Sequence, residues 1–384
     1  MKVLLITNIY PKSKHDKSNS MAIHNLFKYW GNVEVIRPTF LPSGEGLREF
    51  LFSNKKKNSF NKERVNIYTR YVWKIPKTNV YFYNRIIKDR RKTDLPDVII
   101  AHRLHAGLGA WKLSKKEKLP LIIGLHSSDI NILKKKTRRW YNMLSFASLI
   151  ACRSQNIKED LLEIYPFLEN KIFIAASGIS KELIDIELTN SIIDFKNMKR
   201  KKIIKFVTVC RLIKLKNIDN NLKALSKLDK KYEWEYKIIG DGPEKNKLEK
   251  LSKDLNLDDK VEFLGFKNKS EVMELLDESH IFIMVSKPET FGLAYLEAMA
   301  KNCIVIGAKH NGIDGIVDNY KNGFLCEPNN EQELLNIIKE IFHMDVTNLS
   351  FILKNSSETI YNYTEELRSI VYKNKVENVI RGIN

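Results

Sequence analysis

The stretch HIFIMVSKPETFGLAYLEAMAKN, residues 280–302, contains the signals of a strand, a loop and a helix in succession. Its first seven residues are mostly apolar and rich in isoleucine and valine, which is typical of a buried strand in a parallel sheet. Pro288 ends this run, and Gly292 permits a tight turn into a segment of strong helix formers. We expect the core-facing stripe of that helix to consist of Leu293, Leu296 and Ala300.

Two glutamates lie eight positions apart around this turn. Glu297 is expected on the same side of the helix as Leu293, where a carboxylate needs a hydrogen-bonding partner because burying an unpaired charge is costly. Glu289 precedes the helix, where free backbone amides and the helix dipole stabilise an anion such as phosphate. The spacing therefore suits a site that holds an anion and hydroxyl groups. A solvated Glu297 and an ordinary loop Glu289 would also explain it.

The length and composition indicate a globular protein. A chain of 384 residues with 43% hydrophobic residues is long enough for two domains with substantial cores. The four cysteines are far apart and form no CxxC pair, which predicts buried free thiols in a reducing compartment. The apolar stretch at the N-terminus is too short for a signal peptide, and no run reaches membrane-spanning length. We therefore expect a cytoplasmic protein.

The positive charge is concentrated in the first half of the chain. Residues 1–190 contain 34 Lys and Arg against 17 Asp and Glu, whereas residues 191–384 contain 31 against 29. This asymmetry predicts that the first half faces something acidic, either nucleic acid or an anionic membrane. The segment VYFYNRIIKDRRK, residues 80–92, interleaves cations with aromatic and aliphatic residues that could enter a membrane interface or belong to the core. Its expected membrane contacts are Arg85, Lys88, Arg90, Arg91 and Lys92.

Apolar strand patterns alternate with helical patterns along the chain, and the series begins again at IIKFVTVCRL, residues 203–212. This alternation predicts an α/β protein with two Rossmann-like domains whose parallel sheets face a central cleft. The expected parts are an N-terminal domain, a polar linker, a C-terminal domain and a last helix that packs back toward the N-terminal domain. Their boundaries are 1–190, 191–202, 203–360 and 361–384.

Several expected strand ends carry residues that suit a ligand, since ligands of such sheets bind outside the carboxyl ends of the strands. Arg211 and Lys216 could neutralise a diphosphate. The glycines of GDGPE, residues 240–244, permit close backbone approach. His126 follows a strand and could hydrogen-bond a sugar. Surface cations, an ordinary turn and a structural histidine are the alternative explanations.

Taken together, these segments resemble the retaining family 4 glycosyltransferases, which have the two-domain GT-B fold and are also called glycosyl transferases group 1. ETFGLAYLEAMAKNCIVI is similar to the E-x7-E signature of that family, its most specific feature. The resemblance covers nearly the whole chain, because four further segments look like family segments: VTVCRLIKLKNID, GDGPE, HSSDIN and NGFLCEPNN.

The resemblance implies a role for each matching residue. Glu297 would bind the ribose hydroxyls of the donor, and Glu289 would bind the transferred sugar. The expected catalytic residues are Glu289, His126, Arg211 and Lys216. The expected donor-binding residues are Glu297, Phe291, Gly292, Leu293, Gly242, Arg211 and Lys216. A loop that contacts the acceptor or the phosphates would include Asn19, Ser20 and Asp129.

The sequence departs from the family pattern in two places. The loop after the first strand, KHDKSNSMAIHN, lacks the usual glycine, which weakens the assignment of Asn19 and Ser20. Gly315 stands where the family commonly has a glutamate. Both departures bear on which sugar is transferred.

By the resemblance, the chain transfers a hexosyl unit from a nucleoside diphosphate sugar, expected to be a UDP-sugar, with retention of anomeric configuration. The acceptor would be a cell-surface glycan or a lipid-linked molecule, reached at the inner face of the plasma membrane. We expect no cofactor and no metal, because no Asp-x-Asp signature follows a donor-side strand. The alternatives are a GT-B-like sugar-nucleotide epimerase or phosphorylase and a basic nucleic-acid-binding protein. The latter lacks a recognised reader motif, so nucleic acid is not an expected partner. A dehydrogenase is disfavoured by the missing GxGxxG fingerprint.

Overall fold

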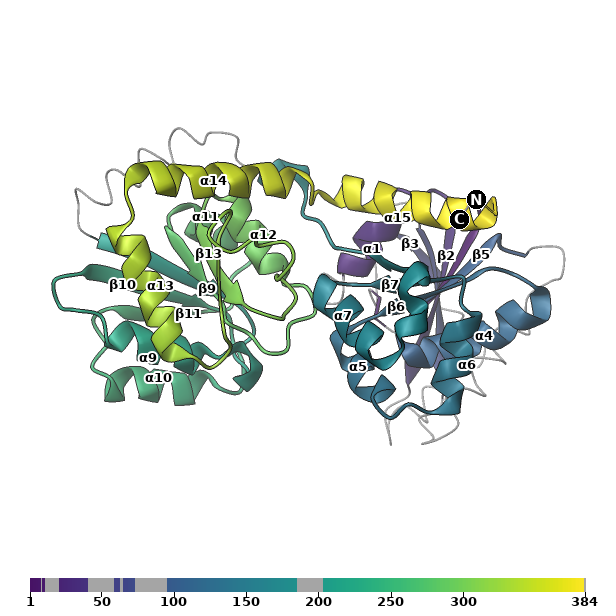
Figure 1. The fold of residues 1–384 in the computed structure, drawn as a ribbon, viewed down its shortest axis with the longest axis horizontal. Helices are drawn as coiled ribbons and strands as arrows, with labels where there is room; N and C mark the ends of the chain where they lie inside the picture. Colours follow the sequence, from purple (N-terminus) through teal and green to yellow (C-terminus); the bar gives the residue numbers. More distant parts are fainter. Residues whose placement is uncertain are drawn as a thin grey trace. The chain divides into compact units, whose positions relative to one another are not determined.

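The computed structural model describes residues 1–7, 9–10, 21–40, 59–62, 65–72, 95–184 and 203–382. The chain divides into two compact units (Figure 1). The first unit consists of Met1–Gly178 together with Glu365–Asn384, and the second unit consists of Ile179–Thr364. The expected linker, residues 191–202, lies outside the described residues.

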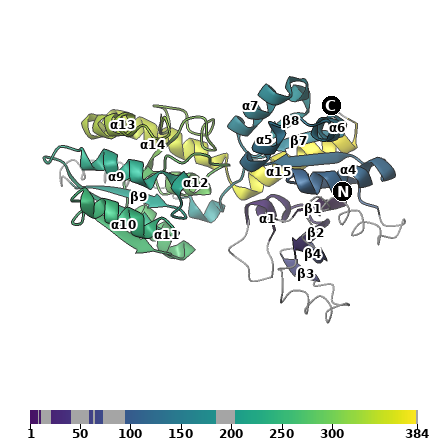
Figure 2. The same cartoon turned by 90° about the horizontal axis from the view of Figure 1, so that it is seen from below.

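The first unit contains a sheet with the strand order β3-β4-β2-β1-β5-β6-β7-β8, part of which is visible in Figure 2. The strands are β1 (Val3–Ile6), β2 (Val33–Phe40), β3 (Ser59–Lys62), β4 (Val65–Val72), β5 (Val98–His102), β6 (Leu121–Leu125), β7 (Leu149–Cys152) and β8 (Ile172–Ile174). The helices of the first unit are α1 (Met21–Phe27), α4 (Leu104–Glu117), α5 (Ser127–Leu133), α6 (Arg138–Phe146), α7 (Gln155–Ile164) and α15 (Glu365–Ile380), and a short 3₁₀ helix spans Pro166–Lys171. A second short 3₁₀ helix, Lys181–Leu183, belongs to the second unit.

This sheet is parallel except at one edge, where β3 pairs antiparallel with β4. The predicted parallel sheet thus has one antiparallel strand at that edge. Only two residues separate β3 from β4, whereas a parallel connection needs a crossover of roughly a dozen residues. Elsewhere the prediction is confirmed, and β1, β5 and β6 are buried along their whole length as expected for central parallel strands.

The second unit contains a parallel sheet with the strand order β11-β10-β9-β12-β13-β14. Its strands are β9 (Ile203–Val209), β10 (Glu233–Ile239), β11 (Val261–Gly265), β12 (Ile281–Ile283), β13 (Ile304–Ala308) and β14 (Phe324–Cys326). Its helices are α9 (Ile218–Ser226), α10 (Lys245–Asp254), α11 (Lys269–Asp277), α12 (Leu293–Ala300), α13 (Glu331–His343) and α14 (Val346–Tyr361), with a 3₁₀ turn, η3, at Lys214–Lys216.

The strand order of the second unit reverses at β9, which has β10 on one side and β12 on the other. Such a reversal is where open α/β sheets bind ligands, outside the carboxyl ends of the strands. A ligand-binding site is therefore expected in the loops that follow β9 and β12.

Helix α12 is more completely buried than its sequence predicted. Leu296 and Ala300 belong to the core as expected, but Leu293 is only half-buried and Tyr295 is buried instead. The helix contacts α11, α14 and β13, so it has no single core-facing stripe. Leu293 and Glu297, one turn apart, lie on its less buried side.

The last helix, α15, packs against α1 within the first unit, so segments far apart in the sequence meet there. Lys28 Nζ lies 2.7 Å from Glu365 Oε2. Trp30 Nε1 donates a hydrogen bond to Ser369 Oγ at 3.0 Å. Tyr372 is buried among aromatic rings that include Phe27 and Trp30. The first unit is thus completed by the end of the chain.

The four cysteines are free thiols, as predicted. Cys152, Cys303 and Cys326 are buried and Cys210 is half-buried. Within the described ranges, no helix is both long enough and apolar enough to cross a bilayer.

Candidate functional site

The loop between β12 and α12 is shaped by a glycine that the sequence singled out. Gly292 caps α12 in the left-handed conformation, with φ 84°. A Cβ atom at this position would lie 2.5 Å from the Tyr295 ring. Both the positive φ and the lack of space require glycine, so the predicted tight turn into the helix is confirmed.

Glu289 in this loop forms an ion pair with Lys216, which lies on η3 after β9. Lys216 Nζ is 2.5 Å from Glu289 Oε2, and both side chains are more than four-fifths buried, with 18% and 15% exposed. The Thr290 amide donates a hydrogen bond to Glu289 Oε1 at 3.0 Å. The structure thus brings together two predicted site residues from the loops on either side of the strand-order reversal.

A second loop, which follows β13, packs against the Glu289 loop. Asn311, which is 4% exposed, accepts a hydrogen bond from the Glu289 amide at 3.2 Å and donates one to the Lys309 carbonyl at 2.8 Å. A Cβ atom on Gly312 would lie 2.4 Å from the Phe291 nitrogen, so the two loops touch backbone to backbone. The position of Glu289 therefore depends on the loop after β13.

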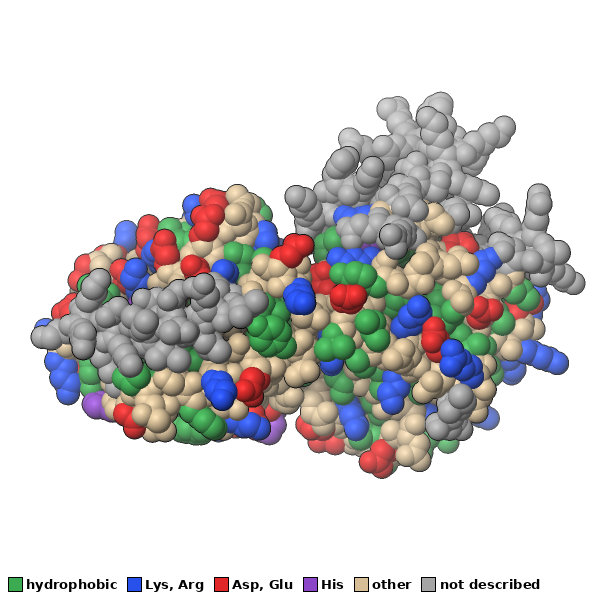
Figure 3. Space-filling view, turned by 90° about the horizontal axis from the view of Figure 1, so that it is seen from above, with side chains coloured by type: hydrophobic (Ala, Val, Ile, Leu, Met, Phe, Trp, Pro, Cys, Tyr) green, Lys and Arg blue, Asp and Glu red, His purple; other side chains and the backbone are tan. Residues whose placement is uncertain are grey.

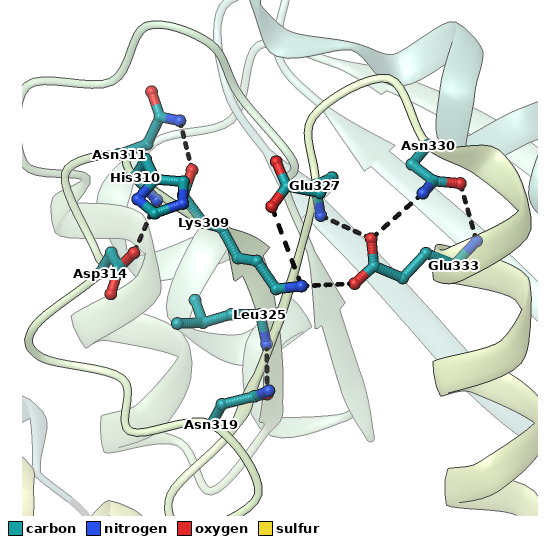
Figure 4. Close-up of polar contacts among 9 residues, drawn as sticks. All are labelled: Lys309, His310, Asn311, Asp314, Asn319, Leu325, Glu327, Asn330 and Glu333. Carbon is teal, nitrogen blue, oxygen red and sulfur yellow. Dashed lines mark hydrogen bonds and ion pairs between the residues drawn. The ribbon is translucent and has the colours of Figure 1, made fainter.

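That second loop is itself anchored by charge (Figure 4). Lys309 Nζ lies 2.6 Å from Glu333 Oε1 on α13 and 3.9 Å from Glu327 Oε1. The hydrogen bond from Lys309 to Glu333 raises the pKa of Lys309. Across the loop, the His310 amide donates a hydrogen bond to Asp314 Oδ2 at 2.6 Å. Gly315, where the family pattern has glutamate, adopts φ 87° in the same loop.

Glu297 also has a lysine partner. Lys269 Nζ, from the first turn of α11, lies 2.5 Å from Glu297 Oε1, and the glutamate side chain is 16% exposed. This satisfies the predicted need of the carboxylate for a partner. Sequence reasoning did not find Lys269, because nothing local indicates that α11 would place it beside α12.

Arg211 lies in the loop after β9 and is exposed. Among the described residues its side chain has no hydrogen bond or ion pair, so its guanidinium group can meet a ligand. The backbone of the GDGPE segment packs directly against this loop. A Cβ atom on Gly240 would lie 1.8 Å from the Cys210 carbonyl oxygen, and one on Gly242 would lie 2.3 Å from that of Leu212. The close packing of the GDGPE backbone against the backbone of the loop after β9 therefore requires both glycines.

His126 in the first unit follows β6, as predicted, and precedes α5. Its amide donates a hydrogen bond to Asp129 Oδ2 at 3.0 Å. Asp129 Oδ1 accepts from Arg103 Nε at 3.2 Å and from the Leu104 amide at 3.4 Å. Asp129 has no exposed surface. In this structure it organises the starts of α4 and α5, and its suggested contact with an acceptor or a phosphate stays a prediction.

A buried polar cluster lies around His126. His102, the last residue of β5, is fully buried, and its ring centroid lies 5.9 Å from that of His126. The Tyr372 ring from α15 lies 6.3 Å from that of His102. Arg153 follows β7 and donates to the Ala175 carbonyl oxygen at 2.7 Å. A polar residue ending an apolar strand was a signal for His102, but Tyr372 could not be anticipated.

Both imidazoles of this cluster are neutral at physiological pH. Burial, reinforced by the charge of Arg153, lowers the pKa of His102 to about 3 and that of His126 to about 2. Within the described part of the chain, both ring nitrogens of His102, Nε2 of His126 and Oη of Tyr372 are buried without a hydrogen-bond partner. Buried polar atoms of this kind are normally satisfied by ordered water or a ligand.

Two family models match the chain. Residues 41–183 match Glycosyltransferase Family 4, and residues 190–362 match Glycosyl transferases group 1. The two matches together take in most of the chain. The chain belongs to the group 1, family 4 glycosyltransferases.

Relatives of this glycosyltransferase include N-acetyl-alpha-D-glucosaminyl L-malate synthase of Bacillus anthracis, 24% identical over 287 residues that cover 70% of each chain. Alpha-monoglucosyldiacylglycerol synthase of Acholeplasma laidlawii is 25% identical over 323 residues, which cover 77% of this chain and 80% of that protein. The crystal structure of Anabaena HepE in complex with UDP and glucose superimposes with a TM-score of 0.70 at 19% identity, covering 98% of this chain and 100% of that one. The predicted GT-B fold, with two parallel-sheet α/β domains, is confirmed.

Some predicted site residues of the glycosyltransferase lie outside the described residues. These are Asn19, Ser20, Arg85, Lys88, Arg90, Arg91 and Lys92. The ligand contacts assigned to Glu289, Glu297, Arg211, Lys216 and His126 stay predictions.

Proposed function

We propose that the enzyme transfers a hexosyl unit from a UDP-sugar, with retention of anomeric configuration, to a cell-surface glycan or lipid-linked acceptor. The observation that carries this proposal is the pairing of Glu289 with Lys216 at the strand-order reversal of the second unit. In the proposed site, the carboxylate would bind sugar hydroxyls and the cation beside it would bind phosphate, next to the N-terminus of α12.

The donor site follows from these positions. Lys216 has three N–H donors, so it can keep its bond to Glu289 and donate another to the leaving diphosphate. Arg211 supplies a planar fork for a second phosphate oxygen. The amides of Phe291, Gly292 and Leu293 at the start of α12 add the helix dipole. This fixed positive field would stabilise the leaving group without a metal ion.

Glu297 would accept hydrogen bonds from the two ribose hydroxyls. Its Oε1 is engaged by Lys269, and among the described residues its Oε2 has no partner, so that oxygen faces no competitor. Glu289 would bind hydroxyls of the transferred sugar. The neutral imidazole of His126 can hydrogen-bond a sugar as donor or acceptor without adding charge. No side chain is assigned as a covalent nucleophile.

The choice of UDP is supported by HepE, which was crystallised with UDP and glucose. The choice of a lipid-linked or glycan acceptor is supported by the name of the Acholeplasma relative, a glycolipid synthase, and by the basic first half of the chain. Attachment to the anionic inner face of the plasma membrane would follow from that charge.

A thermal-shift screen against UDP, ADP, GDP and the corresponding sugar nucleotides tests the donor, because a bound ligand raises the melting temperature by mass action. We expect UDP and one or more UDP-sugars to stabilise the protein and ADP and GDP to have no effect. A response to ADP or GDP alone would contradict the UDP assignment.

Retention is tested on the product. Proton NMR of the newly formed glycosidic bond should show the anomeric configuration of the donor sugar. An inverted anomeric centre would contradict the proposed mechanism. A changed sugar nucleotide without added acceptor would instead indicate an epimerase.

A further inference from the structure

Each glutamate of the E-x7-E pair has its own lysine, and the two lysines come from different elements. Lys216 from η3 pairs with Glu289, and Lys269 from α11 pairs with Glu297. Both Nζ to carboxylate distances are 2.5 Å. The first pair combines two residues that the sequence already indicated. The second pair contains Lys269, a residue with no assigned role.

The backbone at Lys269 is held firmly. Asn268 caps α11 and accepts hydrogen bonds from the amides of Ser270 at 2.9 Å and Glu271 at 3.2 Å. In return, the Asn268 amide donates to Glu271 Oε2 at 2.8 Å, which completes a capping box. Lys269 therefore starts from a fixed point at the N-terminal end of α11 and reaches across to the side of α12.

The negative charge of Glu297 would by itself weaken binding of the proposed donor. A nucleoside diphosphate is a polyanion, and a bare carboxylate next to its ribose would repel the phosphates. In a partly desolvated site this repulsion is screened less than in water. An ammonium group on one carboxylate oxygen removes most of the negative field and leaves the other oxygen for the hydroxyl groups.

We propose that Lys269 is a positioning residue of the donor site, which orients the Glu297 carboxylate and neutralises it so that a nucleoside diphosphate can bind. This inference rests on the proposed function, since it assumes that the ribose of a nucleotide lies on Glu297. Lys269 makes the site select for a nucleotide with phosphates over the same nucleoside without them.

The same two helices carry a matched control. Lys301, just after α12, lies 3.3 Å from Asp277 Oδ1 at the C-terminal end of α11. This ion pair also ties α11 to α12, but it lies at the opposite ends of the helices from the ligand edge of the sheet. If Lys269 only held the helices together, loss of Lys301 would have a comparable effect.

The test compares Lys269→Met with Lys301→Met. Dissociation constants are measured for UDP by calorimetry and for uridine by competition. We expect Lys269→Met to weaken UDP binding about tenfold, as one uncompensated charge near a polyanion implies, and to change uridine binding less than about twofold. Lys301→Met should leave both constants unchanged. In a Glu297→Gln background, Lys269→Met should have no further effect on UDP.

Three results would overturn the inference. Lys269→Met could leave UDP binding at the wild-type level while Glu297→Gln weakens it. It could strengthen the binding of both UDP and uridine, which would mean that Lys269 competes with the ligand for Glu297. Lys301→Met could weaken UDP as much as Lys269→Met does, which would make the role structural. Failure of the wild-type protein to bind UDP would instead contradict the proposed function, so the two failures are distinguishable.

Discussion

At the scale of single residues, the two glutamates have different surroundings. Glu289 lies in a loop, with Lys216 on one oxygen and the Thr290 amide on the other. Glu297 lies on a helix, with Lys269 on one oxygen. The first arrangement suits the reacting sugar and the second suits a bound ribose.

We expect Glu297→Ala to weaken UDP binding by about 1.5–3 kcal/mol, because the ribose hydroxyls lose a charged hydrogen-bond partner. Glu289→Ala should reduce kcat far more than it reduces UDP affinity. Calorimetry on both variants measures the UDP affinity, and steady-state kinetics measures kcat. Unchanged UDP affinity in Glu297→Ala would contradict the ribose assignment.

Arg211→Ala and Lys216→Ala should each reduce kcat by about 100-fold or more, the scale expected when one preorganised stabiliser of developing charge is removed. Since Lys216 also holds Glu289, the double variant Lys216→Ala, Glu289→Ala should lose less than the product of the two single effects. Activity should survive EDTA. Loss of activity with chelator and rescue by Mn²⁺ would contradict a metal-free mechanism.

At the scale of elements, the strand-end loops are held by close backbone contacts. Gly240→Ala would place Cβ 1.8 Å from the Cys210 carbonyl oxygen, so we expect it to unfold the second unit or abolish UDP binding. Gly265 also has positive φ, but a Cβ atom added there would meet no other atom within 4 Å. Gly265→Ala should therefore cost only about 1–2 kcal/mol. Thermal unfolding compares the two, and equal stability of both variants would contradict the packing argument.

The buried histidine at the end of β5 makes stability depend on pH. The pKa of His102 is about 3 in the folded chain and 6.5 when exposed, so below pH 6.5 the unfolded chain binds a proton that the folded chain does not. Stability should therefore fall as the pH drops. In His102→Gln the slope between about pH 6 and pH 5 should be shallower by about 1.4 kcal/mol per unit.

Urea unfolding followed by tryptophan fluorescence reports mainly on the first unit, which contains four of the five tryptophans. A slope that is the same in His102→Gln and in the wild-type chain would contradict the buried neutral state.

The elements that sequence could predict are those with local signals. The β12 strand, the Gly292 turn and the α12 helix follow from an apolar run, a glycine and helix formers in immediate succession. The antiparallel β3, the burial of Tyr295 in place of Leu293 and the pairing of Lys269 with Glu297 depend on which elements become neighbours. Tyr372 beside His102 joins positions 270 residues apart, and one sequence carries no signal for such a contact.

At the scale of the whole molecule, the excess positive charge belongs to the first half of the sequence. On the face drawn in Figure 3, Lys and Arg side chains are interspersed with Asp and Glu over both units. The predicted membrane segment, residues 80–92, lies outside the described residues. Its role is open to a direct test on the intact protein.

We expect the protein to pellet with anionic liposomes at low salt, to be released at high salt, and to ignore neutral liposomes, because each Lys or Arg near an anionic surface contributes about 1 kcal/mol within a Debye length. Charge reversal at Arg90, Arg91 and Lys92 should weaken pelleting and leave UDP binding intact. Equal binding to neutral and anionic vesicles, or none to either, would favour a soluble acceptor.

In the proposed donor site, the second unit holds a nucleoside diphosphate sugar between Glu289 and Glu297. A crystal structure of the protein with UDP tests this most directly. We expect UDP at the carboxyl ends of β9 and β12, with both ribose hydroxyls on the Glu297 carboxylate and the diphosphate within hydrogen-bond distance of Arg211 and Lys216. UDP bound elsewhere, or a ribose that does not touch Glu297, would contradict it.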